Sequence, residues 1–314
     1  MSCPGDRKVA VLSPGLYANC KPSLEMPWYI IVTMADESYL KGLEKWRAEM
    51  DANLRRENDR LALAGIFWLQ KGFNTFGSSQ DCDIILPKPA PRIIGAFEFD
   101  GTNVTLTLDL GQSIELNGKP IQTAVALNTD DADSPSYVTY QNLRMVPIRR
   151  AHGVGVRLWD NCRPERESFP GRTWFAPDEE FRVSAAYTPY PVPVKVQLPN
   201  ILGEMEEDFM HGYVSVRLLG RSNQLEASEF SDGRLYIQFK DTSNGLTTYP
   251  GGRYVYTEPV QEDGLLSIDF NKAFNPPSAF SEYSTSTFAH KRNQLKLPVE
   301  AGEKYGELDS PVAD

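Results

Sequence analysis

The stretch Phe97-Glu-Phe-Asp-Gly-Thr-Asn-Val-Thr-Leu-Thr-Leu108 alternates apolar and polar residues on both sides of the dipeptide Asp100-Gly101. Successive side chains of a strand point to opposite faces, so this alternation is typical of half-buried antiparallel strands. Ile114-Glu-Leu116 repeats the pattern before Asn117-Gly118. Both dipeptides supply the positive φ of a type I′ hairpin turn. We therefore expect residues 63–150 to form an all-β sandwich.

An amphipathic helix is predicted ahead of the sandwich, over residues 36–62. Apolar side chains recur there at steps of three and four residues, at Leu40, Leu43, Trp46, Met50 and Leu54. This spacing places them on one helical face. Asp36 precedes the run as a candidate N-cap, and the helix is expected to end near Leu61. Residues 1–35 contain four prolines and are interpreted as an N-terminal extension that follows the surface or extends a neighbouring sheet.

The C-terminal half, residues 151–304, is predicted to be a second β-rich domain without a long helix. Its expected strands are residues 183–187, 194–198, 213–218, 235–239, 254–256 and 265–270. Residues 305–314 carry acidic side chains around Pro311 and are interpreted as a loose tail. The predicted fold class is thus mainly β, with a helix, a sandwich and a second β-rich half.

Composition narrows the classes of function. The 314 residues are 41% hydrophobic, enough for a sizeable core, and the formal charge of −10 argues against a nucleic-acid partner. Residues 28–34 are apolar but far shorter than the ~20 residues that cross a bilayer. The N-terminus lacks the pattern of a secretory signal, so we expect no membrane partner and a cytoplasmic location.

Metal and nucleotide sites are not indicated. The cysteines stand at positions 3, 20, 82 and 162, and none lies at ligand spacing from the histidines at 152, 211 and 290. Glycine-rich phosphate-binding motifs are missing from the sequence, and so is Gly-x-Ser-x-Gly. We therefore expect no metal and no cofactor.

The run Thr75-Phe-Gly-Ser-Ser-Gln-Asp-Cys-Asp-Ile-Ile-Leu-Pro87, followed by Leu116-Asn-Gly-Lys-Pro120, resembles the frame of a forkhead-associated domain. That resemblance implies a β-sandwich. Relatives of this kind bind phosphothreonine through an Arg directly after the first Gly and a Ser and a His in the next loop. This chain has Ser78 in place of the Arg, and residues 89–95 contain neither Ser nor His. A phosphopeptide partner is therefore not expected.

A second resemblance spans roughly residues 36–305. The chain is similar to the family called domain of unknown function 1684 (DUF1684), which implies a shared fold but no activity. The motifs that carry the resemblance are Trp46-Arg47, Gly65-Ile-Phe-Trp-Leu69, Asn74-Thr-Phe-Gly77, Asp83-Ile-Ile-Leu-Pro87, Phe239-Lys-Asp241, Tyr249 to Arg253, Asp269-Phe-Asn271, Asn275-Pro-Pro277, Asn293 and Ala301-Gly-Glu-Lys304. By this resemblance, cysteines are expected at two positions where the chain has Ser278 and Ser286.

Polar residues concentrate between Phe239 and Lys304 in a way that indicates a buried network or a site, because charged groups leave water only when paired. In the functional interpretation, Asp241 and Asp269 are general acids or bases and Arg253 holds an anionic substrate group. In the structural interpretation, Asp241 caps the turn that follows it and Arg253 pairs with Asp269. The further binding candidates are Asn271, Asn275, Asn293, Tyr249 and Trp174.

Two functions remain open on this sequence. One is cofactor-independent acid/base chemistry on a small organic molecule, by hydrolysis, isomerisation, dehydration or cyclisation. The other is a non-catalytic binding or scaffold protein whose polar cluster is structural. The geometry of the carboxylates separates them: an enzyme should hold one facing an open pocket without a partner, and a scaffold should hold both satisfied.

Overall fold

The computed structural model describes residues 36–306, so the predicted N-terminal extension and the end of the predicted tail lie outside the described residues. The first element is α1 (Glu37–Leu54). Asp36 caps it as predicted, since its carboxylate accepts a hydrogen bond from the backbone N–H of Ser38 at 3.0 Å. The helix ends at Leu54 rather than near Leu61, because the chain after it is polar and turns at Asn58 with a φ of 59°.

Two sheets pack around a common apolar core in the sandwich. The strands of the first sheet, in spatial order, are β1 (Leu63–Trp68), β11 (Gly153–Asp160), β10 (Leu143–Arg150), β9 (Val138–Tyr140), β6 (Ile114–Leu116) and β7 (Lys119–Ile121). Those of the second are β3 (Ile84–Ile85), β2 (Gly72–Gly77), β4 (Gly95–Phe99), β5 (Val104–Leu108) and β8 (Val125–Leu127). Phe76, Phe97 and Leu106 are fully buried between the sheets.

Both predicted hairpins form, but only one has the predicted turn. Asn117 and Gly118 have φ values of 51° and 76° and connect β6 to β7 directly, as a type I′ turn does. At Asp100-Gly101 the connection is four residues long. The Asp100 carboxylate accepts hydrogen bonds from the backbone N–H groups of Thr102 and Asn103, at 2.7 and 2.8 Å, and this side-chain bonding favours the longer loop.

The sandwich extends past the predicted boundary at residue 150. Residues 151 and 152 form the turn of the β10–β11 hairpin, and β11 pairs with β10 on one side and β1 on the other. The alternation Val154/Val156/Leu158 therefore belongs to the sandwich core and not to the C-terminal half. The resemblance to forkhead-associated domains stays a prediction.

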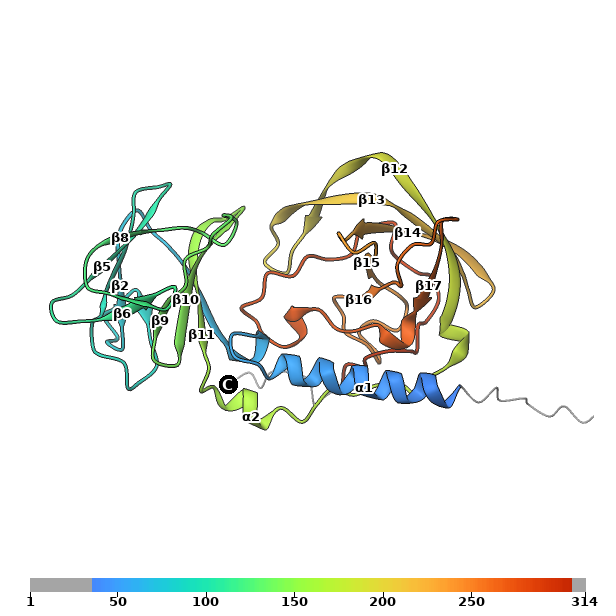
Figure 1. Cartoon of the computed structure of the whole chain (residues 1–314), viewed down its shortest axis with the longest axis horizontal. Helices are drawn as coiled ribbons and strands as arrows, with labels where there is room; N and C mark the ends of the chain where they lie inside the picture. Colours follow the sequence, from blue (N-terminus) through green and yellow to red (C-terminus); the bar gives the residue numbers. More distant parts are fainter. Residues whose placement is uncertain (1–35, 307–314) are drawn as a thin grey trace, which may run out of the picture. The chain divides into compact units, whose positions relative to one another are not determined.

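The C-terminal half is one antiparallel sheet that curls on itself (Figure 1). Its strands, in spatial order, are β16 (Arg253–Tyr256), β15 (Leu235–Phe239), β14 (Arg221–Glu229), β13 (Met205–Leu218), β12 (Arg182–Pro199) and β17 (Leu265–Asp269). The two edge strands approach each other at an antiparallel bridge between Thr257 and Ile268, which gives a half-barrel. The mainly β fold class is thus confirmed.

Between residues 55 and 306, helical structure is confined to short turns. These are η1 (Arg60–Ala62), α2 (Pro164–Ser168), η2 (Glu179–Phe181), η3 (Phe270–Lys272) and η4 (Pro277–Ala279). None of the helices within residues 36–306 has the length and apolar character needed to cross a bilayer. The cytoplasmic location stays a prediction.

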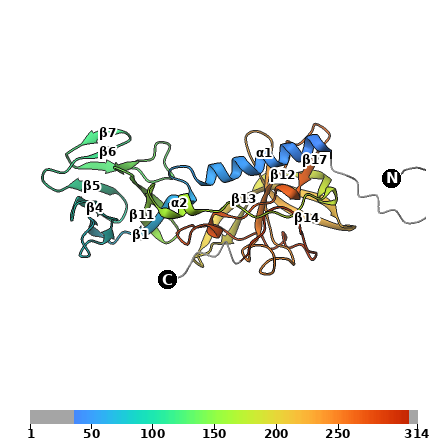
Figure 2. The same cartoon turned by 90° about the horizontal axis from the view of Figure 1, so that it is seen from below.

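Helix α1 contacts residues 172–174 of the segment that leads into β12. It lies along the C-terminal strands in both views (Figure 1 and Figure 2). Trp46 packs edge-on against Trp174, with ring centroids 5.5 Å apart. Asp51 forms an ion pair with Arg172 at 3.2 Å. A ring contact and a charged contact, about one and a half turns apart on the helix, therefore fix both its rotation and its position.

Within the sandwich, Asp83 links β3 to β2. The hydroxyl and the backbone N–H of Thr75 donate to its carboxylate at 2.8 and 2.7 Å, and the hydroxyl bond is the main reason that the pKa of Asp83 lies below its usual value. A carboxyl with a lowered folded-state pKa adds stability above its unfolded pKa, and that stability is lost as the pH falls through the folded value.

We expect Thr75→Val to destabilise the protein by about 1 kcal/mol at pH 7, because one charge-assisted hydrogen bond is lost. The difference from wild type should shrink as the pH falls below about 4, where Asp83 is protonated in the unfolded state. Urea titrations between neutral and acid pH measure both effects. Thr105→Val, two strands away in β5, is the control. A loss that is constant with pH would contradict the role assigned to Asp83.

Candidate functional site

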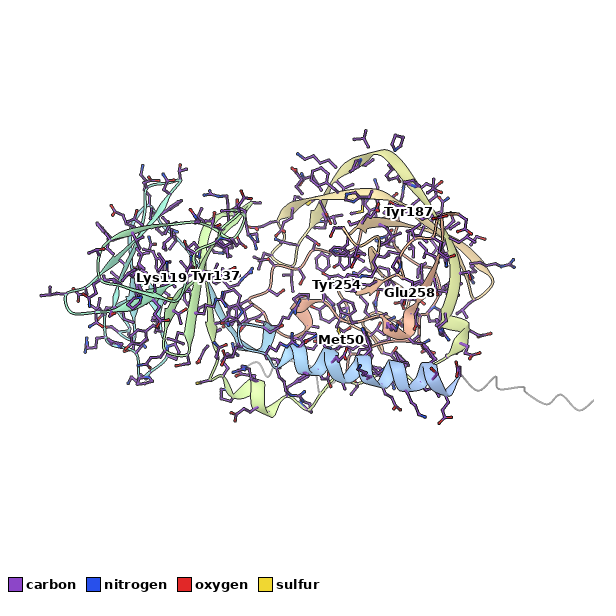
Figure 3. All side chains as sticks on the ribbon, viewed as in Figure 1. Met50, Lys119, Tyr137, Tyr187, Tyr254 and Glu258 are labelled. Carbon is purple, nitrogen blue, oxygen red and sulfur yellow. The ribbon has the colours of Figure 1, made fainter. Side chains whose placement is uncertain are left out.

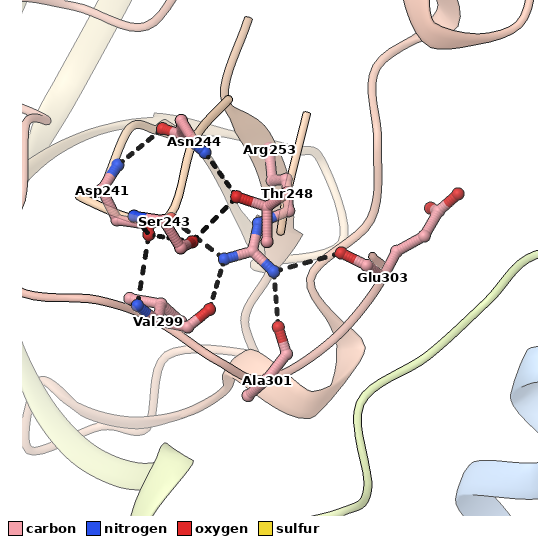
Figure 4. A network of polar contacts seen from close by, with 8 residues as sticks. All are labelled: Asp241, Ser243, Asn244, Thr248, Arg253, Val299, Ala301 and Glu303. Atoms are coloured by element: carbon pink, nitrogen blue, oxygen red, sulfur yellow. Dashed lines mark hydrogen bonds and ion pairs between the residues drawn. The ribbon is translucent and has the colours of Figure 1, made fainter. Parts of the chain in front are cut away.

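Asp241 and Arg253 form a fully buried ion pair, with Asp241 Oδ2 2.9 Å from a terminal nitrogen of Arg253 (Figure 4). Asp241 Oδ1 accepts hydrogen bonds from the backbone N–H of Ser243 at 2.8 Å, from the Ser243 hydroxyl, and from the backbone N–H of Val299 at 3.2 Å. The predicted turn cap is therefore confirmed. The predicted partner of Arg253 is wrong: the pair is made with Asp241 and not with Asp269.

Arg253 also binds the backbone of the C-terminal segment. Its terminal nitrogens donate to the carbonyl oxygens of Val299 at 2.6 Å, of Ala301, and of Glu303 at 3.3 Å. These carbonyls belong to alternate residues of the C-terminal segment, which bends at Gly302. Burial lowers the pKa of Arg253, and the neighbouring Asp241 opposes that effect. A single guanidinium thus holds this segment to the sheet.

Two glycines allow the network to close. Gly252 has a φ of 94°, and a Cβ there would lie 2.6 Å from the carbonyl oxygen of Phe239. Gly302 has a φ of 79°, and its Cβ would lie 2.5 Å from the carbonyl oxygen of Ala273. Only a residue without a side chain fits these positive-φ positions next to a backbone.

Asp269 and Asn271 belong to a second network, which reaches α1. The Tyr39 hydroxyl donates to both oxygens of Asp269, at 3.0 and 3.2 Å. Asn271 donates to Asp269 Oδ1 from its backbone N–H and from its side-chain amide, each at 3.1 Å. Asn271 also exchanges two hydrogen bonds with the backbone of Asp178, at 2.8 and 2.9 Å. Burial, and then the charge of Asp269, raise the pKa of Tyr39. The Asp269 carboxylate therefore helps hold α1 in place.

Three other predicted residues lie in separate surroundings. Asn293 bridges strands, since it accepts from the backbone N–H of Glu226 at 2.7 Å and donates to the carbonyls of Glu226 and Gln238 at 2.8 Å. Tyr249 packs edge-on against Tyr305, with centroids 4.9 Å apart. Tyr305 is thereby held to the domain, where a loose tail was expected. Trp174 contacts α1, as described above.

Asn275 differs from the other candidates because it borders open space. Its backbone N–H donates to Glu303 Oε2 at 2.7 Å and its side-chain amide donates to the Lys304 carbonyl at 3.0 Å. Its Oδ1 is buried without a hydrogen-bond partner among residues 36–306, and the residue lines a cleft of about 630 Å³. Of the eight predicted residues, Asn275 alone borders this cleft.

The cleft lies on the opposite face of β15 and β16 from the Asp241–Arg253 pair. Strand alternation places Phe239 and Arg253, which are directly opposite each other, on the core side. The same alternation places the pairs Tyr236–Tyr256 and Gln238–Tyr254 on the cleft side. The ion pair therefore supports the wall of the cleft from behind and does not face into it.

Aromatic rings make up much of that wall. Tyr256 stacks on Phe274, with centroids 5.6 Å apart and planes 25° apart, and Tyr236 lies 5.1 and 5.4 Å from Tyr254 and Tyr256. The remainder comes from several elements. Met50 of α1 and Tyr254 of β16 both line the cleft and are labelled in Figure 3. The other wall residues include Asn53, Arg157, Trp159, Arg172, Glu206, Phe280 and residues 284–287.

Sequence interpretation missed this wall, although a signal was present. Tyr236-x-Gln238 and Tyr254-x-Tyr256 place tyrosine and glutamine side chains at a spacing of two within predicted strands. Such residues share one face, and a face of tyrosines and glutamine is not a core face. No comparable signal locates Arg157 and Trp159, because nothing in the sequence indicates that the outer side of β11 faces this cleft.

Comparison with known proteins places the chain in a family. The family model described as protein of unknown function (DUF1684) matches residues 167–304. The chain belongs to this family. The solution NMR structure of an uncharacterized protein of Haloarcula marismortui is 31% identical; the match covers 45% of this chain and 80% of that chain, with a TM-score of 0.38. The comparison with curated proteins gave no match.

The DUF1684 match contains all eight predicted site residues and all the tyrosines of the cleft wall. The resemblance predicted for residues 36–166 stays a prediction. Ser278 and Ser286, the positions where cysteines were expected by resemblance, are neighbours: the backbone N–H of Ser278 donates to Ser286 Oγ at 3.1 Å. Ser286 lines the cleft, so a side-chain difference at this pair changes its surface.

We expect Asp241→Asn to destabilise the protein by about 3–5 kcal/mol, because Arg253 would be left as a buried charge without a counter-charge. Arg253→Met should be similarly costly, and the double variant should cost clearly less than the sum of the two. Urea denaturation measures all three against Glu300→Gln, an exposed control. A small loss in Asp241→Asn would instead favour a carboxylate available for chemistry.

Asp269→Asn should cost about 1–3 kcal/mol, since the hydrogen bonds from Tyr39 and Asn271 would no longer reach a charged acceptor. Tyr39→Phe should be less costly, and the double variant should match Asp269→Asn closely because both changes break the same contact. Thermal unfolding of the three variants checks this. Additive losses would show that Asp269 and Tyr39 act independently.

Proposed function

We propose that this protein binds a small organic molecule in the cleft between the tyrosine wall of β15–β16 and the residues of α1, with the Asp241–Arg253 network as its frame. This is the non-catalytic alternative of the two that the sequence left open. The observation that supports it is the placement of the candidate groups: the carboxylates of Asp241 and Asp269 are bound to protein donors and do not line the cleft, whereas the cleft carries aromatic rings and, within residues 36–306, polar atoms of Asn275 and Arg157 without hydrogen-bond partners.

The size of the cleft fits a small ligand. Its volume of about 630 Å³ falls in the range of ligand pockets, and its wall combines aromatic rings with polar and charged side chains that can orient a ligand. Tyr256 is 38% exposed and presents a ring to the cleft. A planar molecule packed there would bury aromatic area on both partners, which is a strong source of affinity.

Polar groups are available to orient such a ligand. The Oδ1 of Asn275 can accept a hydrogen bond, and its side chain is held in place because its amide group is bound to Lys304. The hydroxyl groups of Ser284 and Ser286 lie 2.9 Å apart in the adjacent wall. The substrate-binding role predicted for Asn275 is therefore kept in this proposal, whereas acid/base chemistry by Asp241 or Asp269 stays a prediction.

The test is an NMR titration of the isotope-labelled full chain with naphthalene-2-carboxamide, an uncharged planar probe. We expect saturable shifts of residues in the cleft wall, and Tyr256→Ser should weaken binding several-fold because the stacking surface is removed. Tyr137→Ser is a matched control, since Tyr137 has nearly the same exposure, 37% against 38%, but does not line the cleft. Equal effects of the two substitutions, or shifts confined to the sandwich, would contradict the proposal.

A further inference from the structure

Arg157 is a charged side chain of the cleft that lacks an ion-pair partner within residues 36–306. It lies in β11 between Val156 and Leu158, which are 0% and 2% exposed in the sandwich core. Alternation therefore directs the Arg157 side chain away from that core, and it lines the cleft. Trp159, two residues on, lines the cleft as well, with its ring 5.8 Å from the guanidinium.

The guanidinium of Arg157 has five N–H donors and few acceptors. One terminal nitrogen donates to the Thr285 hydroxyl at 3.4 Å, and Nε is buried without a hydrogen-bond partner. Within residues 36–306, Arg157 takes part in no ion pair. The other two arginines of the cleft are both paired: Arg60 lies 2.9 Å from Asp59, and Arg172 lies 3.2 and 3.3 Å from Asp51 and Glu303.

The nearby carboxylates of Glu206 and Asp130 form no ion pair with Arg157. Glu206 also lines the cleft, but its carboxylate accepts a hydrogen bond from the Asn200 side chain at 2.8 Å. Asp130 is paired with Arg150 at 2.7 Å. Burial, and then the charge of Arg150, lower the pKa of Arg157, while Asp130 and Glu206 act in the opposite direction. The group remains a cation at neutral pH, because arginine loses its proton only far above that range.

A partly desolvated cation without a counter-ion is unfavourable in the free protein, and a bound anion removes that cost. A planar carboxylate matches the guanidinium fork with two parallel hydrogen bonds. We propose, on the basis of the function proposed above, that the ligand of the cleft is a planar small molecule with a carboxylate group. The carboxylate binds Arg157 and the ring system packs against the tyrosine wall.

If Arg157 has a structural role, its substitution should lower the stability of the ligand-free protein. If it has a ligand-binding role, the substitution should not lower that stability. Arg172 supports the fold through two carboxylates, so Arg172→Gln should lower the melting temperature. Arg157→Gln removes an unpaired charge, so the melting temperature of the ligand-free protein should stay the same or rise. This comparison needs no ligand and uses two arginines of the same cleft.

The binding experiment compares naphthalene-2-carboxylate with naphthalene-2-carboxamide, which differ in charge but hardly in shape. Wild type should bind the carboxylate roughly tenfold more tightly, as expected for a charge-assisted hydrogen-bonded pair. Arg157→Gln should abolish this preference and lower the affinity for the carboxamide far less than the affinity for the carboxylate. Glu206→Gln should raise the affinity for the carboxylate, because a neighbouring negative charge is removed. Arg217→Gln, an exposed position on β13, is the control and should change neither affinity.

The proposal of an anionic ligand would be overturned if wild type bound the two probes equally, or if the preference for the carboxylate survived Arg157→Gln. The proposed function of the cleft would still stand in that case, provided that Tyr256→Ser weakened carboxamide binding. A melting temperature of Arg157→Gln as low as that of Arg172→Gln would assign Arg157 to the fold and overturn the inference as well. Failure of both probes to bind would overturn it together with the proposed function.

Discussion

The buried pair of Asp241 and Arg253 is the contact on which the C-terminal half depends. Two charges have left water completely, and this is tolerated because every strong acceptor near Arg253 is used: one carboxylate and three backbone carbonyls. Those carbonyls belong to the last segment of the described chain, whose Leu295, Leu297 and Val299 fill the core. The pair thus ties a segment without regular strand pairing to β15 and β16, and so closes the half-barrel from inside.

Strands β15 and β16 carry the contacts that stabilise the fold on one face and the proposed ligand-binding groups on the other. On the core face, the Asp241 carboxylate and the terminal nitrogens of Arg253 are bound to protein groups, so little is left to interact with a ligand. On the cleft face, Tyr256 exposes its ring beside Tyr236 and Tyr254, and within residues 36–306 Asn275 and Arg157 retain polar atoms without hydrogen-bond partners. A rigid core face keeps the rings of the cleft face in position before a ligand arrives, which reduces the ordering cost of binding.

The sequence was sufficient to predict the fold class and many local features, but it was insufficient to locate the candidate site. Alternation and capping are local, so the hairpins, the cap at Asp36 and the turn cap at Asp241 could be predicted. The partner of Arg253 could not, because the choice between Asp241 and Asp269 depends on which strands are neighbours in the sheet. The length of α1 was overestimated because its polar continuation has no periodicity that marks an end.

The cleft was missed for a related reason. A buried charged network and a binding surface use the same residue types, and composition alone does not show on which side of a strand each side chain lies. In Tyr254 and Arg253 the two roles occupy consecutive positions, and only the strand register separates them. A shift of one residue would move Arg253 into the cleft and a tyrosine into the core. The register is therefore what makes one face a frame and the other a binding surface, and the Asp241–Arg253 pair is the contact that holds that register.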